Sequence, residues 1–262
     1  MERILSNSLN SIVDNIERLG TAGAFLLTGL VRMATPPFKP GPIIKQIHFI
    51  GARSMLVIIV SGFFVGMVIA LQFYDTLVRF GSVSLLGSAV GLSLIRELGP
   101  VLTALMIIGR AGSATCAEIS IMRTEHQIDA LECMAIDPLR YLIAPRFLAG
   151  IISVPLLTAI FIVVGVVGGY FVGVILLNVS PGSYFQGMYE TVLVRDIVMG
   201  LVKSLTFGLL IIWIATVKGF YLHLSKSGVY GSEGVSRNTT DAVVISSIAI
   251  LCSDYIISAL IL

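Results

Sequence analysis

The sequence has few charged residues: Asp, Glu, Lys and Arg make up 12% of its 262 positions, against about 25% in soluble domains. Hydrophobic residues supply 56%, enough for several of the roughly 20-residue apolar runs that cross a membrane as helices. A secretory signal is also missing, because residues 1–18 are polar and no cleavage site follows a short apolar run. A soluble domain is thereby excluded, and we expect a membrane protein that inserts through internal spans and keeps its N-terminus.

Residues and motifs for catalysis are scarce too. The three cysteines are an odd number without C-x-x-C spacing, which indicates neither a disulfide framework nor a zinc site. The three histidines are scattered and form no metal-binding constellation. Neither the phosphate-binding G-x-x-x-x-G-K-[ST] loop nor the G-x-S-x-G nucleophile elbow occurs. We therefore expect no enzyme, no metal and no cofactor bound by this chain, which cannot hydrolyse ATP alone.

The apolar runs predict an all-α integral membrane protein with an amphipathic N-terminal helix. In residues 1–35, apolar side chains recur at helical spacing with charges on the other face, as in helices that lie in the membrane interface. We assign residues 1–45 to this helix and a connector, and residues 46–262 to a single five-span domain. The spans are expected at about residues 54–74, 85–108, 147–177, 197–217 and 242–262.

Glycine and proline predict how the spans are shaped. The pair Gly62 and Gly66 in the first span, and Gly165 and Gly169 in the third, have the spacing that permits close helix contact. Pro100 removes a backbone donor and predicts a kink in the second span. The segments between helices are expected to be a stiff proline connector at 36–42, a loop or re-entrant segment at 77–84, a loop with one short amphipathic turn at 178–196, and a polar loop at 218–237.

Basic residues predict the orientation. Most of the 17 Lys and Arg residues precede the first span or lie between the second and third, or fourth and fifth, spans. Since loops rich in Lys and Arg stay in the cytoplasm, these segments and the N-terminus are expected to be cytoplasmic. Five spans then place the C-terminus outside.

Four ionisable residues lie inside the predicted spans: Arg96, Glu97, Lys203 and Asp254. Each costs a few kcal/mol in the middle of a membrane on insertion scales, so each should face a partner or a wet cavity. One interpretation is structural, with the four pairing to hold helices together. The other is functional, with some of them bordering a path for a charged headgroup.

The polar interval after the second span predicts a helix at about 124–137. Thr124 and Gln127 fit a capping box, and Pro138 ends the segment. A solvated face is one explanation of its charges, but its apolar stripe needs a cover, which a groove on a partner would supply. The residues concerned are Glu125, Ile128, Asp129, Leu131, Glu132 and Met134.

Several short motifs, in this order and spacing, resemble those of the MlaE family, the permease subunits of bacterial ABC transporters that move phospholipid between inner and outer membranes. The similarity extends from about residue 54 to the C-terminus. The motifs are R-E-L-G-P (96–100), G-R-A-G-S-A (109–114), A-E-I (117–119), M-R (122–123), E-C-M-A-I-D-P-L-R (132–140) and P-R-F (145–147).

We expect a homodimer, because five spans enclose little space and the glycine ladders offer contact faces. The resemblance implies a permease of the bacterial inner membrane, with its C-terminus in the periplasm, that maintains the lipid asymmetry of the outer membrane. Its implied partners are phospholipid, a cytoplasmic ABC ATPase that binds ATP and Mg, a STAS-domain subunit and a periplasmic MCE-domain lipid-binding protein; no nucleic acid is expected. The 124–137 helix would dock on the ATPase, and the four in-span charges match polar features of the transport path or its support.

The resemblance also places a lipid pocket near the outer ends of the first two spans. Ordinary helix packing explains each of the matching positions equally well, and at Phe80 the family often has Tyr instead. The positions are Ile69, Gln72, Phe73, Thr76, Leu77 and Phe80.

Two other classes of function remain open. A proton-coupled secondary transporter would titrate Glu97 or Asp254 and need no ATPase. An integral membrane enzyme of lipid metabolism would need a convergent His–carboxylate set at the membrane surface. The sequence has neither the inverted repeat that favours the first nor a set that favours the second.

Overall fold

The computed structural model describes residues 17, 20–33, 35, 40–221 and 231–261. Within these ranges every regular element is a helix. Five helical stretches are long and apolar enough to cross a membrane: Pro40–Arg79, Val83–Thr124, Leu139–Leu176, Val194–Phe220 and Ser232–Ile261. The prediction of an all-helical chain with five helices able to cross a membrane is confirmed.

The first stretch begins earlier than the sequence suggested. It consists of α2 (Pro40–Ile50), a short 3-10 turn (Ala52–Ser54) and α3 (Met55–Arg79). Pro40 and Pro42, expected in the connector, instead lie in the first turn of α2, where a missing N–H leaves no helical bond unmade. The expected loop at 77–84 is also mostly helical, because α3 continues to Arg79 and a 3-10 turn (Val83–Leu85) follows.

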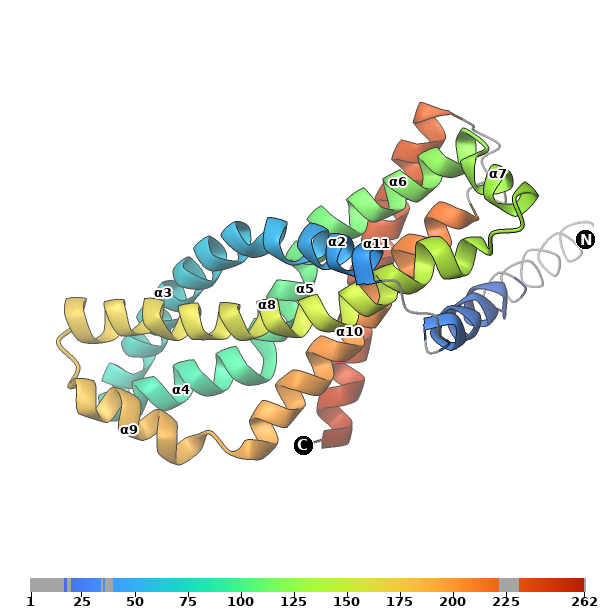
Figure 1. The fold of residues 1–262 in the computed structure, drawn as a ribbon. Coiled ribbons are helices and arrows are strands. Elements are labelled where there is room, and N and C mark those ends of the chain that lie inside the picture. The colour runs from blue at the N-terminus through green and yellow to red at the C-terminus, as the bar shows by residue number, and fades with distance from the viewer. Residues whose placement is uncertain (1–16, 18–19, 34, 36–39, 222–230, 262) are drawn as a thin grey trace, which may run out of the picture.

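The second stretch is kinked, as Pro100 predicted. It comprises α4 (Leu86–Ser93), a π-helical segment (Leu94–Leu98), α5 (Gly99–Ile107), a second π-helical segment (Ile108–Gly112) and α6 (Ser113–Thr124). Pro100 lies in the first turn of α5, and Figure 1 shows the chain changing direction between α4 and α5. The helix continues beyond residue 108, the predicted end of the span, through the polar residues of α6.

The helix after α6 is shorter than predicted. It is α7 (Gln127–Cys133), and it begins after His126, whose backbone is left-handed with φ 56°. The capping box is wrong: Thr124 is the last residue of α6, and its hydroxyl donates 2.9 Å back to the Ser120 carbonyl. The chain then enters a π-helical segment (Leu139–Ile143), α8 (Ala144–Tyr170) and a further π-helical segment (Phe171–Leu176).

The last third of the chain contains more helix than expected. The segment predicted to hold one short turn forms α9 (Pro181–Thr191), an 11-residue helix. Helix α10 (Val194–Phe220) follows, and α11 (Ser232–Ile261) starts inside the predicted polar loop. In Figure 1, α7 and α9 lie at opposite ends of the bundle.

The N-terminal helix is described only at residue 17 and over residues 20–33, so most of the predicted amphipathic pattern lies outside the described residues. The described part packs on the bundle. The indole N–H of Trp213 in α10 donates 2.9 Å to the Ala22 carbonyl, and Phe25 contacts the rings of Phe220 and Tyr221. This helix is therefore fixed to the end of α10 near α7.

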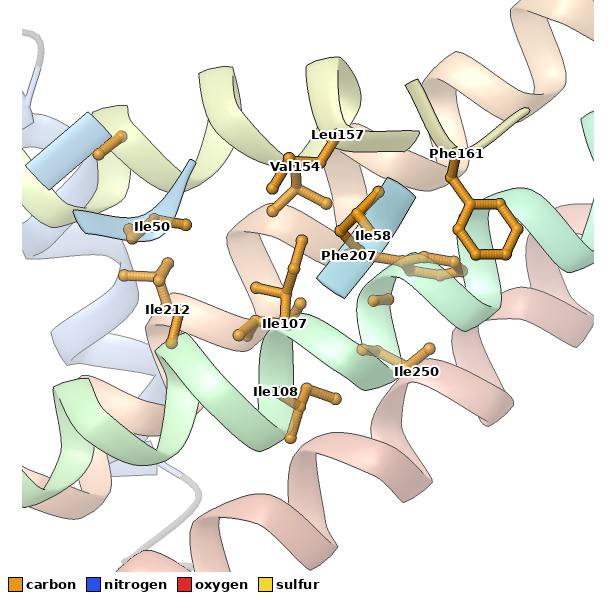
Figure 2. Packing of buried hydrophobic residues seen from close by; sticks show 14 of the residues in the cluster. Ile50, Ile58, Ile107, Ile108, Val154, Leu157, Phe161, Phe207, Ile212 and Ile250 are labelled. Carbon is orange, nitrogen blue, oxygen red and sulfur yellow. The ribbon is translucent and has the colours of Figure 1, made fainter. Parts of the chain in front are cut away.

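The glycine pairs of the first and third spans pack against each other within this one chain, so these faces are already occupied and are not free for a second copy. A Cβ on Gly66 of α3 would lie 1.9 Å from the carbonyl oxygen of Gly165 in α8, so only glycine permits this approach. Figure 2 shows the apolar interior, in which buried side chains from α2, α3, α5, α8, α10 and α11 converge. The labelled residues are Ile50, Ile58, Ile107, Ile108, Val154, Leu157, Phe161, Phe207, Ile212 and Ile250.

Candidate functional site

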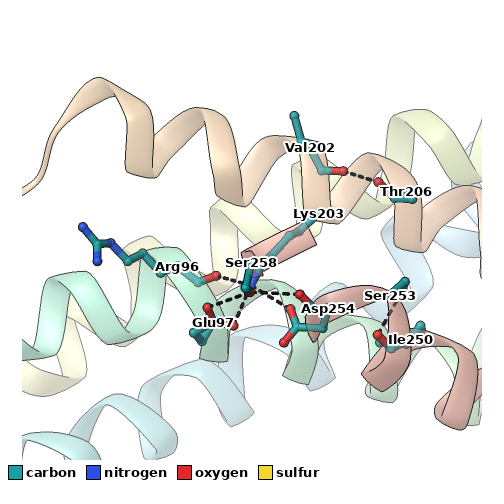
Figure 3. Close-up of polar contacts among 9 residues, drawn as sticks. All are labelled: Arg96, Glu97, Val202, Lys203, Thr206, Ile250, Ser253, Asp254 and Ser258. Carbon is teal, nitrogen blue, oxygen red and sulfur yellow. Dashed lines mark hydrogen bonds and ion pairs between the residues drawn. The ribbon is translucent and has the colours of Figure 1, made fainter. Parts of the chain in front are cut away.

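Three of the four charged residues predicted inside spans converge on one point (Figure 3). The ammonium group of Lys203 in α10 lies 2.5 Å from Glu97 Oε2 and 2.8 Å from Asp254 Oδ1 of α11. It also donates 3.0 Å to the Arg96 carbonyl, and the Ser258 hydroxyl donates 3.1 Å to Glu97 Oε1. One ammonium therefore joins three membrane helices. We call Glu97, Lys203, Asp254 and Ser258 the charge cluster.

The fourth residue, Arg96, points to a different partner. Its Nε and Nη2 both lie 2.8 Å from Asp196 Oδ1 at the start of α10. The other oxygen, Asp196 Oδ2, accepts the Leu193 N–H at 2.9 Å. Asp196 is buried, and the sequence analysis placed it in a loop. Arg96 and Glu97 are neighbours in the chain, but they form separate ion pairs with two residues of the same helix, Asp196 and Lys203 of α10.

Local backbone geometry brings α10 to these residues. Arg96 and Glu97 lie in the π-helical segment Leu94–Leu98, and such wide turns occur often at functional sites. On α10, a Cβ at Gly200 would lie 2.7 Å from the Ile95 carbonyl oxygen. Glycine at 200 therefore allows the close approach that carries Lys203, one turn further on, to the Arg96 carbonyl.

The charge cluster is buried on one side and open on the other. Lys203 is completely buried, whereas 42% of the Glu97 side chain is exposed on the surface of this chain. With all three groups ionised, two carboxylates face one ammonium, and the cluster carries one net negative charge. The arrangement combines helix pairing with an accessible polar surface inside a spanning region, so it can contact the polar part of an amphiphile.

The six predicted lipid-pocket residues divide between two faces of α3. Ile69, Phe73 and Leu77 turn toward the packed interior. Gln72, Thr76 and Phe80 are exposed. Within this single chain, Gln72, Thr76 and Phe80 are the three most open to a ligand or to another subunit, and Phe73 and Leu77 are half-buried.

The apolar stripe of the predicted 124–137 helix is divided as well. Ile128 is fully buried in the chain's own core and Leu131 packs against that core, so neither needs a partner to cover it. Met134 remains 61% exposed. Asp129 is held by Arg123 and His126, each at 2.8 Å.

Glu125 and Glu132 are exposed. The exposed surface of this segment therefore includes Glu125, Glu132, Met134 and the neighbouring residue Ile136.

Sequence reasoning missed three polar contacts between helices. Besides Asp196, these involve Arg110, which donates 3.0 Å to the Phe49 carbonyl and 2.6 Å to the Ser54 hydroxyl at the break between α2 and α3. Arg146 is buried and pairs with Glu118 at 2.9 Å. Both arginines follow apolar runs directly, which was a signal that they lie against the bundle. In the described part of the chain, no group of three His, Cys, Asp or Glu side chains could hold a metal ion.

Comparison with known proteins identifies relatives along nearly the whole chain. The family described as Permease MlaE matches residues 43–260. The intermembrane phospholipid transport system permease protein MlaE of Haemophilus influenzae is 43% identical over 251 residues, covering 95% of this chain and 94% of the relative. A probable ABC transporter permease protein of Rickettsia bellii is 42% identical and covers 98% of each. One from Synechocystis is 36% identical, covering 90% of this chain and 88% of the relative.

Proposed function

The chain belongs to the MlaE permease family, and from this membership we propose that it moves phospholipid between the inner and outer membranes as the permease subunit of an ABC transporter. Its role would be to maintain the lipid asymmetry of the outer membrane. The relatives' names support the phospholipid substrate and the ABC-transporter class, since one is a phospholipid transport permease and others are ABC transporter permeases.

The proposed complex contains two copies of this chain and a pair of cytoplasmic ATPase subunits that bind ATP and Mg. A STAS-domain subunit and a periplasmic MCE-domain lipid-binding protein complete it. The chain would lie in the bacterial inner membrane with its N-terminus in the cytoplasm and its C-terminus in the periplasm. The distribution of Lys and Arg supports this orientation.

One structural relationship carries the proposal that an ATPase drives this chain. The short helix α7 directly follows the stretch Val83–Thr124, and that stretch also contains Glu97 of the charge cluster. A helix transmits displacement along its length when its side chains are packed, as those of α5 and α6 are. Movement of α7 on a partner would therefore reach the π-helical segment and change the packing around Lys203.

The charge cluster would then act on the lipid headgroup. Glu97 is accessible, and Lys203 supplies a positive charge beside it. The ammonium group of a zwitterionic headgroup entering this surface would compete with Lys203 for the Glu97 carboxylate. Binding of ATP to the partner would shift the chain between two conformations with different affinity for lipid, which is alternating exposure of one site. The exposed residues Gln72, Thr76 and Phe80 would complete the lipid pocket across the dimer.

The decisive experiment substitutes Met134, which is exposed, and not Leu131, which packs on this chain's own core. The chain is purified in mild detergent, co-purifying ATPase is identified, and ATP hydrolysis and lipid transfer are measured. We expect Met134→Asp to lose the ATPase and lipid transfer, while Met134→Leu, which keeps an apolar side chain at this position, retains both. Unchanged complex formation in Met134→Asp would contradict the assignment of α7 as the coupling helix.

The same preparation distinguishes the rival functions. A chain that purifies alone and moves lipid or solute in response to a proton gradient would be a secondary transporter. A chain that chemically alters the lipids supplied to it would be an enzyme of lipid metabolism. Either result would overturn the proposed function, whatever the effect at Met134.

A further inference from the structure

A cavity of about 230 Å³ lies apart from the charge cluster, near α7. It is lined by the end of the helix at 20–33, the first turn of α2, the segment between α7 and α8, and the start of α8. Much of its wall is apolar, with Met33, Ile43 and Leu148 among the lining residues. Its polar residues come from two segments that are far apart in the sequence.

Two arginines and one aspartate form the polar edge of the cavity. Arg32 Nε lies 3.0 Å from Asp137 Oδ2, and 45% of the Arg32 side chain is exposed. Arg140 Nη2 donates 3.4 Å to the Thr35 carbonyl, a long contact. The other oxygen, Asp137 Oδ1, accepts the Leu139 N–H at 3.0 Å. These three side chains carry a formal charge of +1 above an apolar wall, and both guanidinium groups are engaged in contacts.

We propose that this cavity binds the headgroup phosphate of an anionic phospholipid, with the first part of the acyl chains against the apolar wall. Guanidinium groups bind phosphate oxygens through strong, often paired hydrogen bonds. Basic pockets beside membrane helices on the cytoplasmic side are typical sites for anionic lipid headgroups. The cytoplasmic placement of this end rests on the orientation proposed above. The site is separate from the charge cluster and is not part of the transport path.

The size and the charge of the cavity define what it accepts. Pockets that enclose a whole drug-sized ligand measure about 300–1,000 Å³, so this smaller cavity holds a headgroup and leaves most of each acyl chain in the membrane. Free phosphate would contact the arginines but gain nothing from the apolar wall. Asp137 is the competitor, because its carboxylate occupies Arg32 and repels an entering phosphate.

This competition gives a test in two directions. The purified full-length chain, depleted of lipid in detergent, is mixed with equal amounts of phosphatidylglycerol and phosphatidylcholine, and bound lipids are counted by native mass spectrometry. We expect the wild type to prefer phosphatidylglycerol. Arg32→Gln with Arg140→Gln should reduce that preference by about tenfold or more, as expected for lost charged hydrogen bonds. Asp137→Asn should increase it, since the amide keeps the Oδ1 acceptor but removes the competing charge.

The matched control is Arg237→Gln. It removes one positive charge from an exposed i,i+4 pair with Glu233 in α11, away from the cavity, and should bind lipid as the wild type does. Any lipid held at the charge cluster is present in every variant and cancels in the comparison. Because the readout is binding, it stands independently of whether the chain transports lipid.

Three results would overturn the proposal. The double arginine variant could keep the wild-type preference for phosphatidylglycerol. Arg237→Gln could lose as much of this preference as the double variant does, which would indicate a general charge effect. Inorganic phosphate could displace phosphatidylglycerol at equal concentration, which would indicate a site for the free ion. If the double variant fails to fold, the Asp137→Asn result decides alone, and an unchanged or reduced preference would refute the site.

Discussion

The Nζ of Lys203 lies 2.5 Å from Oε2 of Glu97, although the two residues are 106 positions apart in the sequence. The lysine is completely buried and the glutamate is partly exposed. An ammonium buried without a counter-ion would be strongly destabilising, so this pair fixes how α10 packs against the π-helical segment. The same pair also presents a carboxylate at the surface of a spanning region. Structural and functional interpretations of these charges therefore apply together.

Removal of Lys203 should destabilise the bundle. Lys203→Met leaves Glu97 and Asp254 facing each other without a cation, and breaking a buried ion pair by deleting one partner costs about 3–5 kcal/mol. The partial exposure of Glu97 places the expected loss at the lower end of that range, about 3 kcal/mol. Thermal unfolding of the purified chain in detergent measures the effect.

The double variant Lys203→Met with Glu97→Gln tests the cause. It restores the original net charge of the cluster, so we expect part of the lost stability to return. Lys45→Met, at an exposed position of α2, is the control and should unfold like the wild type. A double variant less stable than Lys203→Met would show that the repulsion between the carboxylates is not the source of the loss.

Arg96 and Asp196 should be energetically coupled. The arginine donates two short hydrogen bonds to one carboxylate oxygen that is buried at the start of α10. A double-mutant cycle with Arg96→Met and Asp196→Asn should give a coupling energy of about 1.5–3 kcal/mol, the range for hydrogen bonds to charged groups. Unfolding measurements on the two single variants and on the double variant give this coupling energy. Additive effects within about 0.5 kcal/mol would mean that the contact contributes nothing.

Gly200→Ala should separate α10 from the π-helical segment. The added Cβ would lie 2.7 Å from the Ile95 carbonyl oxygen, which is backbone and cannot turn away. We expect lower thermal stability together with reduced lipid transfer, since Lys203 would lose its reach to the Arg96 carbonyl. Gly23→Ala is the matched control, because its Cβ meets nothing within 4 Å and alanine favours a helix by about 0.5–1 kcal/mol. Equal stability of the two variants would contradict the close approach at Gly200.

The number of spans was predictable from the sequence, because long apolar runs leave a helix as the only stable form in a membrane. The meeting of Gly66 with Gly165 was predictable in kind, since small residues at this spacing permit close contact. The ends of the helices were harder to predict from the sequence. Pro40 and Pro42 suggested a connector, yet proline is compatible with the first helical turn.

Partners across the fold could not be derived from local sequence. Asp196 lies at the end of a polar segment, and nothing near it indicates Arg96, a hundred positions away. The sequence pattern correctly predicted an apolar stripe on α7. It could not tell whether this chain or another protein would bury the stripe, and at Ile128 it is this chain. Such distinctions depend on three-dimensional packing, not on periodicity.

Tyr184 of α9 should make the fold sensitive to alkaline pH. Its ring is completely buried, and its hydroxyl donates 3.1 Å to the Val166 carbonyl of α8. Burial raises the pKa of this phenol above its ordinary value, which is about 10. Below pH 10 the tyrosine is protonated in both folded and unfolded chains, and Tyr184→Phe should cost only about 1 kcal/mol for the lost hydrogen bond.

Above that pH the unfolded tyrosine releases its proton while the folded one retains it. The unfolded state then binds fewer protons, so stability falls as pH rises toward the folded pKa. Phenylalanine at 184 has no proton to lose, and the other tyrosines are common to both chains. We therefore expect the advantage of the wild type over Tyr184→Phe to shrink, and then to reverse, when thermal unfolding is compared between pH 7 and 11. A constant difference across this range would show that water reaches the hydroxyl and that α9 does not seal it against α8.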